Sequence, residues 1–242
     1  TVRKDRVFEL CEEIHSRKLK FRWDVRAHVN TVTREMLKAM RGAGCDRIHY
    51  GVESGNDRML KVIKKNATIE RIKNAVQWTK EENIEVLTYF IIGQQTETIS
   101  DIGDTIALAK SLNPNYAHFT VFCPYPATEI YAQGLEREII KEDVWKQFAL
   151  NPIPGFELPV WEENFSREEL KKLLVRCYKE FYLRPGYILK SASRMRSMGE
   201  ISRKARAGLS VITMKPNQTR GGKSVAQKVR EIIPHSSYDV HQ

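Results

Sequence analysis

The 242-residue sequence has few cysteines, and no two of them lie close together in the chain. They are Cys11, Cys45, Cys123 and Cys177, and no two are closer than 34 positions. A Cys-x-x-Cys pair, or any related metal-binding spacing, is therefore missing. The pattern indicates four reduced, mostly buried thiols in a cytoplasmic protein, with no metal site on this chain.

Long apolar runs are also missing, because no stretch approaches the roughly 20 apolar residues that cross a bilayer. The first five residues, Thr-Val-Arg-Lys-Asp, do not form a signal peptide. The sequence lacks an initiator Met and enters a helical pattern at once. This start predicts that the chain is the C-terminal portion of a longer protein.

Acidic residues are scarce at the C-terminal end. Residues 184–242 hold 12 Lys/Arg and 3 Asp/Glu, whereas residues 1–183 hold 28 and 27. A basic tail is common in proteins that bind nucleic acid or an anionic surface, so a non-catalytic module acting through residues 184–230 is one alternative function. Tyr187 is the only aromatic residue in that segment, so stacking on a single-stranded nucleic acid is unsupported. A solvated tail without a partner is the other alternative.

Apolar segments with strand character alternate with helical patterns, beginning after a helix expected over 5–18. This alternation is typical of βαβ units and predicts a parallel sheet. Four such units are too few to close an eight-stranded barrel. The predicted strands are 21–25, 46–50, 84–92 and 116–122.

The predicted fold class is therefore α/β, an incomplete (β/α) partial TIM-type barrel with about four βα units over residues 1–127. The alternation stops beyond it, and residues 128–184 are expected to form a helical substrate-side extension with helices near 136–149 and at 166–182. Residues 185–242 are expected to form a basic helix to residue 206 and a tail whose last 27 residues are disordered.

A glycine-bracketed segment after the second predicted strand holds one carboxylate, Glu53. Gly51 and Gly55 on either side allow positive φ and a close approach of the backbone to a ligand. Folds of this class place their ligands at the carboxyl ends of the strands. Glu53 is therefore a candidate site residue, the alternative being a solvated Glu in an ordinary strand-to-helix turn.

Three strand ends carry motifs that resemble the radical S-adenosylmethionine superfamily. The likeness is to its branch that often has an upstream cobalamin-binding domain and includes anaerobic magnesium-protoporphyrin monomethyl ester cyclases. It covers about residues 1–185. The motifs are Gly51-Val-Glu-Ser-Gly55, Tyr89-Phe-Ile-Ile-Gly93 followed by Thr96-Glu-Thr98, and Phe122-Cys-Pro-Tyr-Pro-Ala-Thr128, with Asp24-x-Arg26 before them and Leu183-Arg-Pro-Gly186 after them.

The resemblance implies that S-adenosylmethionine lies across the carboxyl ends of the strands. Glu53 matches the position that contacts its ribose, and Arg26 faces the same mouth. Lys65 stands where related enzymes keep a cation for the methionyl carboxylate. Gly93 matches the turn whose backbone packs on the adenine, and Tyr89 points toward it. A zwitterionic sulfonium ligand needs both signs of charge at one mouth, with bare backbone for its flat base.

Each of these residues also has a structural interpretation. Lys65 could be a solvated cation at a helix end. Arg26 could pair with Asp24 or Asp46, and Tyr89 could belong to the core. The two histidines near strand ends, His28 and His49, are more often hydrogen-bonded structural residues than catalytic ones.

The sequence departs from the family in its cluster motif. The family binds a [4Fe–4S] cluster through three cysteines, usually spaced Cys-x-x-x-Cys-x-x-Cys, and this spacing does not occur here. The glycine-rich contact to the methionyl amino group is also missing, and Gly93-Gln-Gln replaces the usual Gly-Leu-Pro-Gly, which predicts a looser turn. Truncation explains these departures, and a degenerate non-catalytic homologue is the second explanation.

The resemblance implies that the complete protein is an enzyme that cleaves S-adenosylmethionine with a [4Fe–4S] cluster and acts on an unactivated C–H bond. The ligands of the cluster, and of any cobalamin, would lie outside this chain, and this portion alone is expected to be inactive. Its partners would be the missing N-terminal half and a small-molecule substrate. The aromatic and apolar residues of 151–161 and 166–182 favour a large hydrophobic substrate. No glycine turn continues into a phosphate-loop Lys-Ser/Thr, which argues against an ordinary phosphate-binding enzyme.

Overall fold

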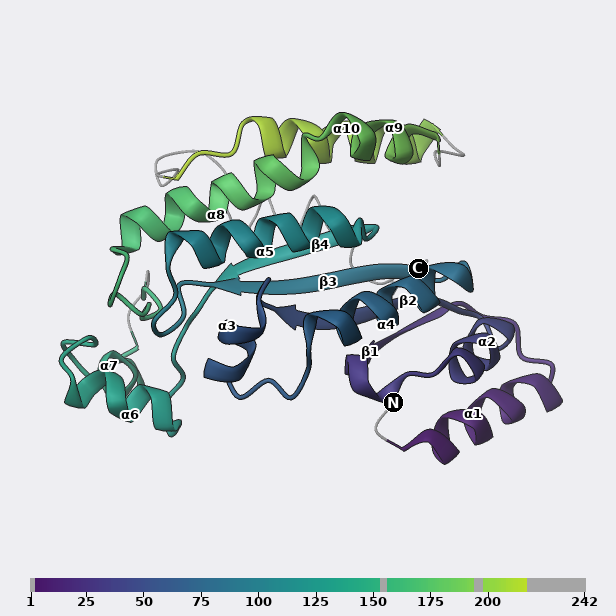
Figure 1. The fold of residues 1–242 in the computed structure, drawn as a ribbon, viewed down its shortest axis with the longest axis horizontal. Helices are drawn as coiled ribbons and strands as arrows, with labels where there is room; N and C mark the ends of the chain where they lie inside the picture. Colours follow the sequence, from purple (N-terminus) through teal and green to yellow (C-terminus); the bar gives the residue numbers. More distant parts are fainter. Residues whose placement is uncertain (1–2, 153–155, 194–197, 217–242) are drawn as a thin grey trace.

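The computed structural model describes residues 3–152, 156–193 and 198–216. In this part of the chain, each strand of a four-stranded sheet pairs in parallel with the next one in sequence. Helices connect the strands (Figure 1), which confirms the predicted α/β fold with four βα units. The strands are β1 (Trp23–Ala27), β2 (Cys45–Glu53), β3 (Glu85–Ile92) and β4 (Tyr116–Val121).

Short polar side chains set the starts of the connecting helices. Thr33, Asn56, Thr68 and Thr98 each accept a hydrogen bond from the backbone N–H three residues on, which satisfies a donor that the helix leaves free. Thr98 also takes part in a full capping box, whereas the box at Thr68 is incomplete, as expected. The helices of this part are α1 (Lys4–Ser16), the 3₁₀ turn η1 (Val29–Thr31), α2 (Arg34–Gly42), α3 (Asp57–Val62), α4 (Ile69–Glu81) and α5 (Ile99–Leu112).

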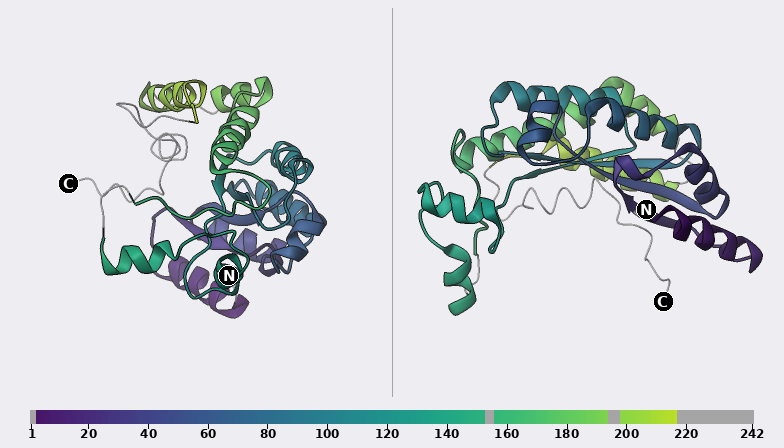
Figure 2. Two further views of the ribbon diagram at one scale, coloured as in Figure 1. Left: turned by 90° about the vertical axis from the view of Figure 1, so that its left-hand side faces the viewer. Right: turned by 60° about the horizontal axis from the view of Figure 1, so that its bottom comes forward.

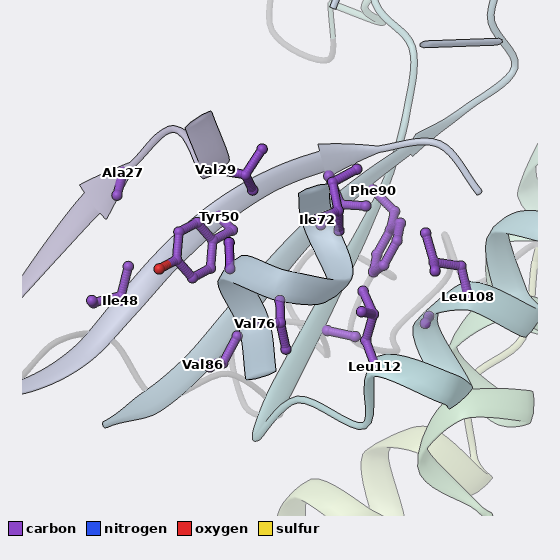
Figure 3. Close-up of a cluster of buried hydrophobic side chains, with 14 of the residues drawn as sticks. Ala27, Val29, Ile48, Tyr50, Ile72, Val76, Val86, Phe90, Leu108 and Leu112 are labelled. Atoms are coloured by element: carbon purple, nitrogen blue, oxygen red, sulfur yellow. The ribbon is translucent and has the colours of Figure 1, made fainter. Parts of the chain in front are cut away.

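One face of the sheet forms the hydrophobic core with α2, α4, α5 and α8 (Arg167–Tyr182). Ile48, Tyr50 and Phe90 from the strands are fully buried there against helical side chains such as Val76 and Leu112 (Figure 3). Burying an apolar side chain of this size stabilises the fold by ~1.5–3 kcal/mol. The core therefore fixes the direction in which alternate strand residues point.

The opposite face of the sheet carries ionisable side chains, and we call it the polar face. Alternation along each strand places these residues away from the core helices, which lie on the other side of the sheet in the right-hand view of Figure 2. Pairing aligns Arg26 with His49, and Gly51 with Tyr89, which is itself aligned with His118. The polar face consists of Asp24, Arg26, Arg47, His49, Tyr89 and His118.

The free edge of β4 is closed by two tyrosines of α8. The hydroxyl of Tyr182 accepts from the N–H of Ala117 and donates to its carbonyl, at 3.0 and 2.9 Å. The hydroxyl of Tyr178 does the same at Phe119, at 3.1 and 2.9 Å. Each hydroxyl thus replaces the two hydrogen bonds that a further strand would make.

The remaining helices are α6 (Glu129–Glu136), α7 (Val144–Leu150), α9 (Pro185–Ser193) and α10 (Met198–Ile212). The single helix expected near 136–149 is wrong, because α6 ends before Glu138, which has a φ of 57°, and Asp143 caps a new helix. The basic helix expected over 185–206 is described as α9 and α10, which lie on either side of the undescribed residues 194–197, and α10 runs six residues past the expected end. The predicted disorder of the last 27 residues falls almost wholly on residues outside the description. None of the described helices combines the length and apolar character needed to span a bilayer.

The ends of two strands differ from the prediction. The first strand begins and ends two residues later than expected. The second does not stop at residue 50, because Gly51, Val52 and Glu53 still belong to β2. Gly51 and Glu53 pair with β3, and the register shifts at Val52 between them. The glycine-bracketed turn is therefore the irregular end of a strand.

Candidate functional site

Glu53 and Lys65 form an ion pair at the carboxyl end of β2. Glu53 Oε1 and Lys65 Nζ are 2.9 Å apart, and only 18% and 19% of the two side chains are exposed. Gly51 lies beneath the pair, and a Cβ there would be 2.3 Å from Glu53 Oε1. Gly51 is therefore required for this close approach, as its place in the motif suggested.

The unusual backbone belongs to Glu53 rather than to the flanking glycines. Glu53 has a φ of 70°, whereas neither Gly51 nor Gly55 has a positive φ, so that part of the prediction is wrong. A non-glycine residue in this region is strained by ~1–3 kcal/mol and such residues cluster at functional sites. Gly55 allows the chain to pack closely against α5, because a Cβ there would be 2.2 Å from the backbone of Asp104 and Thr105.

His28 joins the pair, and we call Glu53, Lys65 and His28 the edge group. Burial lowers the pKa of His28, the charge of Lys65 lowers it further, and Glu53 opposes both. The Nδ1 atom of His28 accepts a hydrogen bond from the backbone of Asn30. The interpretation of Lys65 as a solvated helix-end cation is wrong, because its ammonium is mostly buried against Glu53.

Gly93 turns the chain at the end of β3 with a φ of 77°. The fully buried Glu97 holds this turn, since its Oε2 accepts hydrogen bonds from the N–H groups of Gly93 and Gln94, at 2.5 and 3.1 Å. Burial raises the pKa of Glu97 to about 7. Although Gln94 and Gln95 replace the residues expected from the resemblance, Gln94 is buried and its side chain bonds the carbonyl of Ile91.

The loop before α8 braces the same turn. Glu163 Oε2 accepts from the Thr96 N–H and from the Trp161 indole, both at 3.0 Å, and its other oxygen pairs with Arg137. Leu170 of α8 covers Gly93 so closely that a Cβ on the glycine would be 2.6 Å from it. The turn therefore depends on residues about 70 positions further along the chain.

A cleft of about 450 Å³ is lined in part by residues that adjoin Lys65 and Gly93 in the chain. It is lined by apolar side chains and by three glutamine amides, a combination that suits a flat heterocycle. Its lining is Val62, Ile63, Lys64, Gln94, Gln95, Phe122, Thr128, Glu129, Ile130 and Gln133. A larger, mostly apolar cleft of about 610 Å³ lies between α9, α10 and the start of β4, away from the strand ends that carry Glu53.

Arg26 and Tyr89 lie on the polar face. Arg26 is aligned with His49, four residues before Glu53 on β2, which places it about 13 Å from Glu53 along the sheet at ~3.3 Å per residue. Arg26 pairs with neither Asp24 nor Asp46: Asp24 faces His49, and Asp46 pairs with two other arginines. The Tyr89 hydroxyl is 3.0 Å from His49 Nδ1, so Tyr89 is not a core residue.

The structure thus divides the five predicted site residues into two groups. Glu53, Lys65 and Gly93 lie at the carboxyl edge of the sheet, while Arg26 and Tyr89 lie deeper on the polar face. Sequence reasoning missed Glu97, although its place four residues after Gly93 was a usable signal, because a carboxylate there can accept from the amides of the turn.

The cysteines do not fit a [4Fe–4S] cluster. Cys11, Cys45 and Cys177 are buried, and Cys123 is half-buried. Burial raises the pKa of Cys45 and Cys177 to about 12, so both remain thiols instead of the thiolates that bind iron. In the described part of the chain, no group of three or more His, Cys, Asp or Glu could hold a metal ion.

The basic residues after 183 are partly used within the fold. Arg184, Lys190 and Lys204 each donate hydrogen bonds to backbone carbonyls of α5, α8, α9 or the residue that caps α5. These three cations therefore stabilise helix ends. They contribute nothing specific to the alternative of a nucleic-acid or anionic-surface module.

Residues 1–109 match the model of the radical SAM superfamily. The chain therefore matches the superfamily that its three strand-end motifs suggested. It is 31% identical over 191 residues to an uncharacterized methyltransferase of Pyrococcus horikoshii, and 26% identical over 190 residues to the anaerobic magnesium-protoporphyrin IX monomethyl ester cyclase of Rubrivivax gelatinosus. Each alignment covers 78% of this chain, but 40% and 33% of the relatives. The chain thus spans two fifths or less of their length.

Solved structures show the same fold. Coproporphyrinogen III oxidase of Escherichia coli superposes on 75% of this chain and 37% of its own, with a TM-score of 0.51 and 16% identity. The cobalamin- and [4Fe–4S]-bound methyltransferase of Kitasatospora setae superposes on 55% and 27%, with a TM-score of 0.50 and 16% identity. Both comparisons support the partial-barrel architecture.

Proposed function

We propose that this chain supplies one side of the S-adenosylmethionine site of a radical enzyme. The observation that carries the proposal is the buried Glu53–Lys65 pair, which stands beside the Gly93 turn at the carboxyl ends of adjacent strands. When bound and cleaved, S-adenosylmethionine would supply a 5′-deoxyadenosyl radical that takes a hydrogen atom from an unactivated C–H bond. Residues of this chain bind and orient the cofactor and shield it from water.

The residues of the edge group fit the charges of the cofactor. The ammonium of Lys65 matches the methionyl carboxylate, and the carboxylate of Glu53 can accept hydrogen bonds from ribose hydroxyls. Gly93 is buried under Leu170, so the flat base would lie in the cleft next to this turn, against apolar side chains and glutamine amides. When the cofactor binds, Glu53 and Lys65 exchange their ion pair with each other for contacts with the ligand. Arg26 and Tyr89 lie deeper on the polar face and line the inner part of the same site.

We propose that the cluster cysteines, and any cobalamin site, belong to another portion of the complete protein. The cysteines of this chain do not suit the cluster, and no step can be assigned to them. No described strand pairs with the outer side of β1, whereas β4 is closed by tyrosines. The free side of β1 is therefore where strands of a cluster-bearing portion would join the sheet.

A large hydrophobic substrate is supported by the region after β4. Helix α7 has no buried residue although it carries Val144, Trp145, Phe148 and Leu150. The ring of Trp145 stacks on Tyr125 at 5.6 Å between centroids. In Figure 1, α6 and α7 lie at the end of the sheet toward which the strands run, where a substrate would approach the cofactor.

Equilibrium dialysis with radiolabelled S-adenosylmethionine tests the assignment. Glu53→Gln and Lys65→Met each remove a charge-assisted contact worth ~1.5–3 kcal/mol, so we expect at least tenfold weaker binding. Lys61→Met is the matched control, because Lys61 is exposed, lies four residues from Lys65 and does not line the cleft; its effect should stay under twofold. Equal losses in the two lysine variants, or no saturable binding by the unmodified chain, would contradict the proposal.

A further inference from the structure

The polar face contains a second group of residues, deeper than Glu53 and Lys65, whose contacts with one another the proposed cofactor site does not explain. Parallel strands that are packed on both sides are usually apolar on both faces. Here β1 and β2 place Asp24 and His49 opposite the core instead, next to Tyr89 of β3. These three side chains form a continuous chain of contacts.

Tyr89, His49 and Asp24 have the geometry of an acid–base relay. The Tyr89 hydroxyl is 3.0 Å from His49 Nδ1, and His49 Nε2 is 3.5 Å from Asp24 Oδ2. With the Tyr89 hydroxyl as donor, the neutral imidazole carries its hydrogen on Nε2, facing the carboxylate. A reactive hydroxyl, a base within hydrogen-bond reach and a third group behind the base are the signature of an activated side chain.

The surroundings keep His49 able to accept a proton. Only 11% of its side chain is exposed, and burial lowers its pKa, an effect that Asp24 opposes and that Arg47 and Arg26 reinforce. Its Nε2 atom is buried and makes no hydrogen bond among the described residues. Asp24 Oδ2, at 3.5 Å, is too far to form a good hydrogen bond with the neutral ring but close enough to pair with the imidazolium.

Arg26 completes the group. It is aligned with His49, is exposed, and has no ion pair or hydrogen bond to any described residue. Arg47, by contrast, binds Glu85 through two nitrogens, at 3.0 and 2.7 Å. Arg26 is therefore the cation of this face that remains available to a negative charge on a ligand.

We propose that Tyr89 is a catalytic residue that exchanges a proton with the substrate, with His49 as its base. A proton from an acidic O–H or N–H of the substrate moves to the Tyr89 oxygen as the Tyr89 proton moves to His49 Nδ1. The imidazolium is then matched by Asp24, and the substrate anion by Arg26, so both new charges have a partner. The reverse transfer returns the proton to the product.

His118 also contacts Tyr89 but is not part of the relay. Its ring packs edge-on against Tyr89 at 5.5 Å between centroids, without a hydrogen bond to the hydroxyl. It therefore takes no part in the proton transfer, and a phenylalanine can keep the ring contact. This difference makes His118 the matched control for His49.

The test measures the reactivity of the phenol and needs no cofactor. The chain is acetylated with N-acetylimidazole, and each tyrosine is followed by peptide mass spectrometry. We expect Tyr89 to react faster than Tyr125, whose side chain is far more open at 60% exposure, because only Tyr89 has an adjacent base. We expect His49→Gln to slow Tyr89 by about tenfold or more, and Asp24→Asn to slow it several-fold. His118→Phe should change the rate by less than about threefold.

A purely structural hydrogen bond predicts the opposite sign. Removing His49 would then free the hydroxyl, and Tyr89 would react faster or at an unchanged rate. Either result, or a Tyr89 no more reactive than Tyr125 in the unmodified chain, would overturn the proposal. His49→Phe serves if His49→Gln does not fold, as judged by circular dichroism. The role of Tyr89 in the reaction rests on the proposed function, but this assay contains no S-adenosylmethionine, so the two can fail separately.

Discussion

Glu97 has a buried carboxylate, and we predict that replacing it by glutamine will change how the free energy of unfolding depends on pH. Glu97 is fully buried, its Oε2 accepts from two backbone amides, and its Oε1 has no partner among the described residues. Burial is the main cause that raises its pKa to about 7 from the usual 4.5, and the charge of Asp101 adds to it.

The direction in which stability changes with pH follows from the raised pKa of Glu97. Between pH 4.5 and about 7 the folded chain keeps a proton on Glu97 that the unfolded chain has lost. Stability is therefore greatest below this window and falls as the pH rises through it. Since one pKa unit equals about 1.4 kcal/mol, the loss attributable to Glu97 is about 3 kcal/mol.

Glu97→Gln keeps an oxygen for the amides of Gly93 and Gln94 but cannot ionise. We expect the variant to match the unmodified chain near pH 5 and to exceed it by about 2–3 kcal/mol at pH 8. Urea unfolding at intervals of half a pH unit measures the difference, in which all other titrating groups cancel. Glu163→Gln is the control, because hydrogen bonds from Trp161, Thr96 and Arg137 outweigh burial and lower its pKa, so that its contribution is lost as the pH falls. A Glu97→Gln difference that does not vary from pH 5 to 8 would refute the reasoning.

Three further predictions concern packing, the sheet edge and the cluster. Gly55→Ala should cost about 2 kcal/mol or more in urea unfolding, because its Cβ would meet the backbone of α5, while Gly103→Ala in that helix has open space and should stabilise by ~0.5–1 kcal/mol. Tyr178→Phe should cost about 2 kcal/mol or more by leaving the N–H and carbonyl of Phe119 without partners, and Tyr125→Phe should be neutral within ~0.5 kcal/mol. Reconstitution with iron and sulfide should give no stoichiometric visible iron–sulfur absorbance, and a bound cluster on this chain would contradict its assignment to another portion.

The order of strands and helices could be predicted because each strand has a local signature. The continuous apolar run at 84–92 predicts a buried parallel strand, and it is found as β3 over Glu85–Ile92. The end of β2 could not be predicted in this way, because glycines usually mark turns. It is the pairing of Gly51 with Tyr89, about 40 residues later, that keeps this segment in the sheet.

The helix break after α6 depends on contacts between distant residues. A Cβ on Gly134 would be 2.9 Å from the ring of Trp161, so the helix packs tightly against a residue 27 positions away. The Tyr131 hydroxyl donates to Asp143 and anchors the start of α7. No local pattern reveals these contacts, and periodicity alone therefore joined two helices into one.

The site residues show the same division between local and distant information. The resemblance identified Glu53 and Lys65 by their positions in motifs, but not that the two side chains pair with each other. Their pairing requires Glu53 to adopt a left-handed backbone over Gly51, which depends on the register of β2 against β3. The relay on the polar face joins residues of three strands, so its members are neighbours only once that register is known.

The two outer edges of the sheet differ in whether a further strand can pair with them. Tyr178 and Tyr182 each satisfy both the N–H and the carbonyl of a β4 residue, so a further strand could pair there only by displacing two buried hydroxyls. An added strand would replace the hydrogen bonds of the β4 backbone but leave the two displaced hydroxyls without partners, at a cost of ~1–3 kcal/mol each. No described group closes the outer side of β1 in this way. Additional strands would therefore join at β1, next to Arg26, Asp24 and the polar face. A cluster-bearing portion added there would face the candidate relay across the interior of the barrel, which connects the proposed cofactor chemistry with the proposed proton transfer.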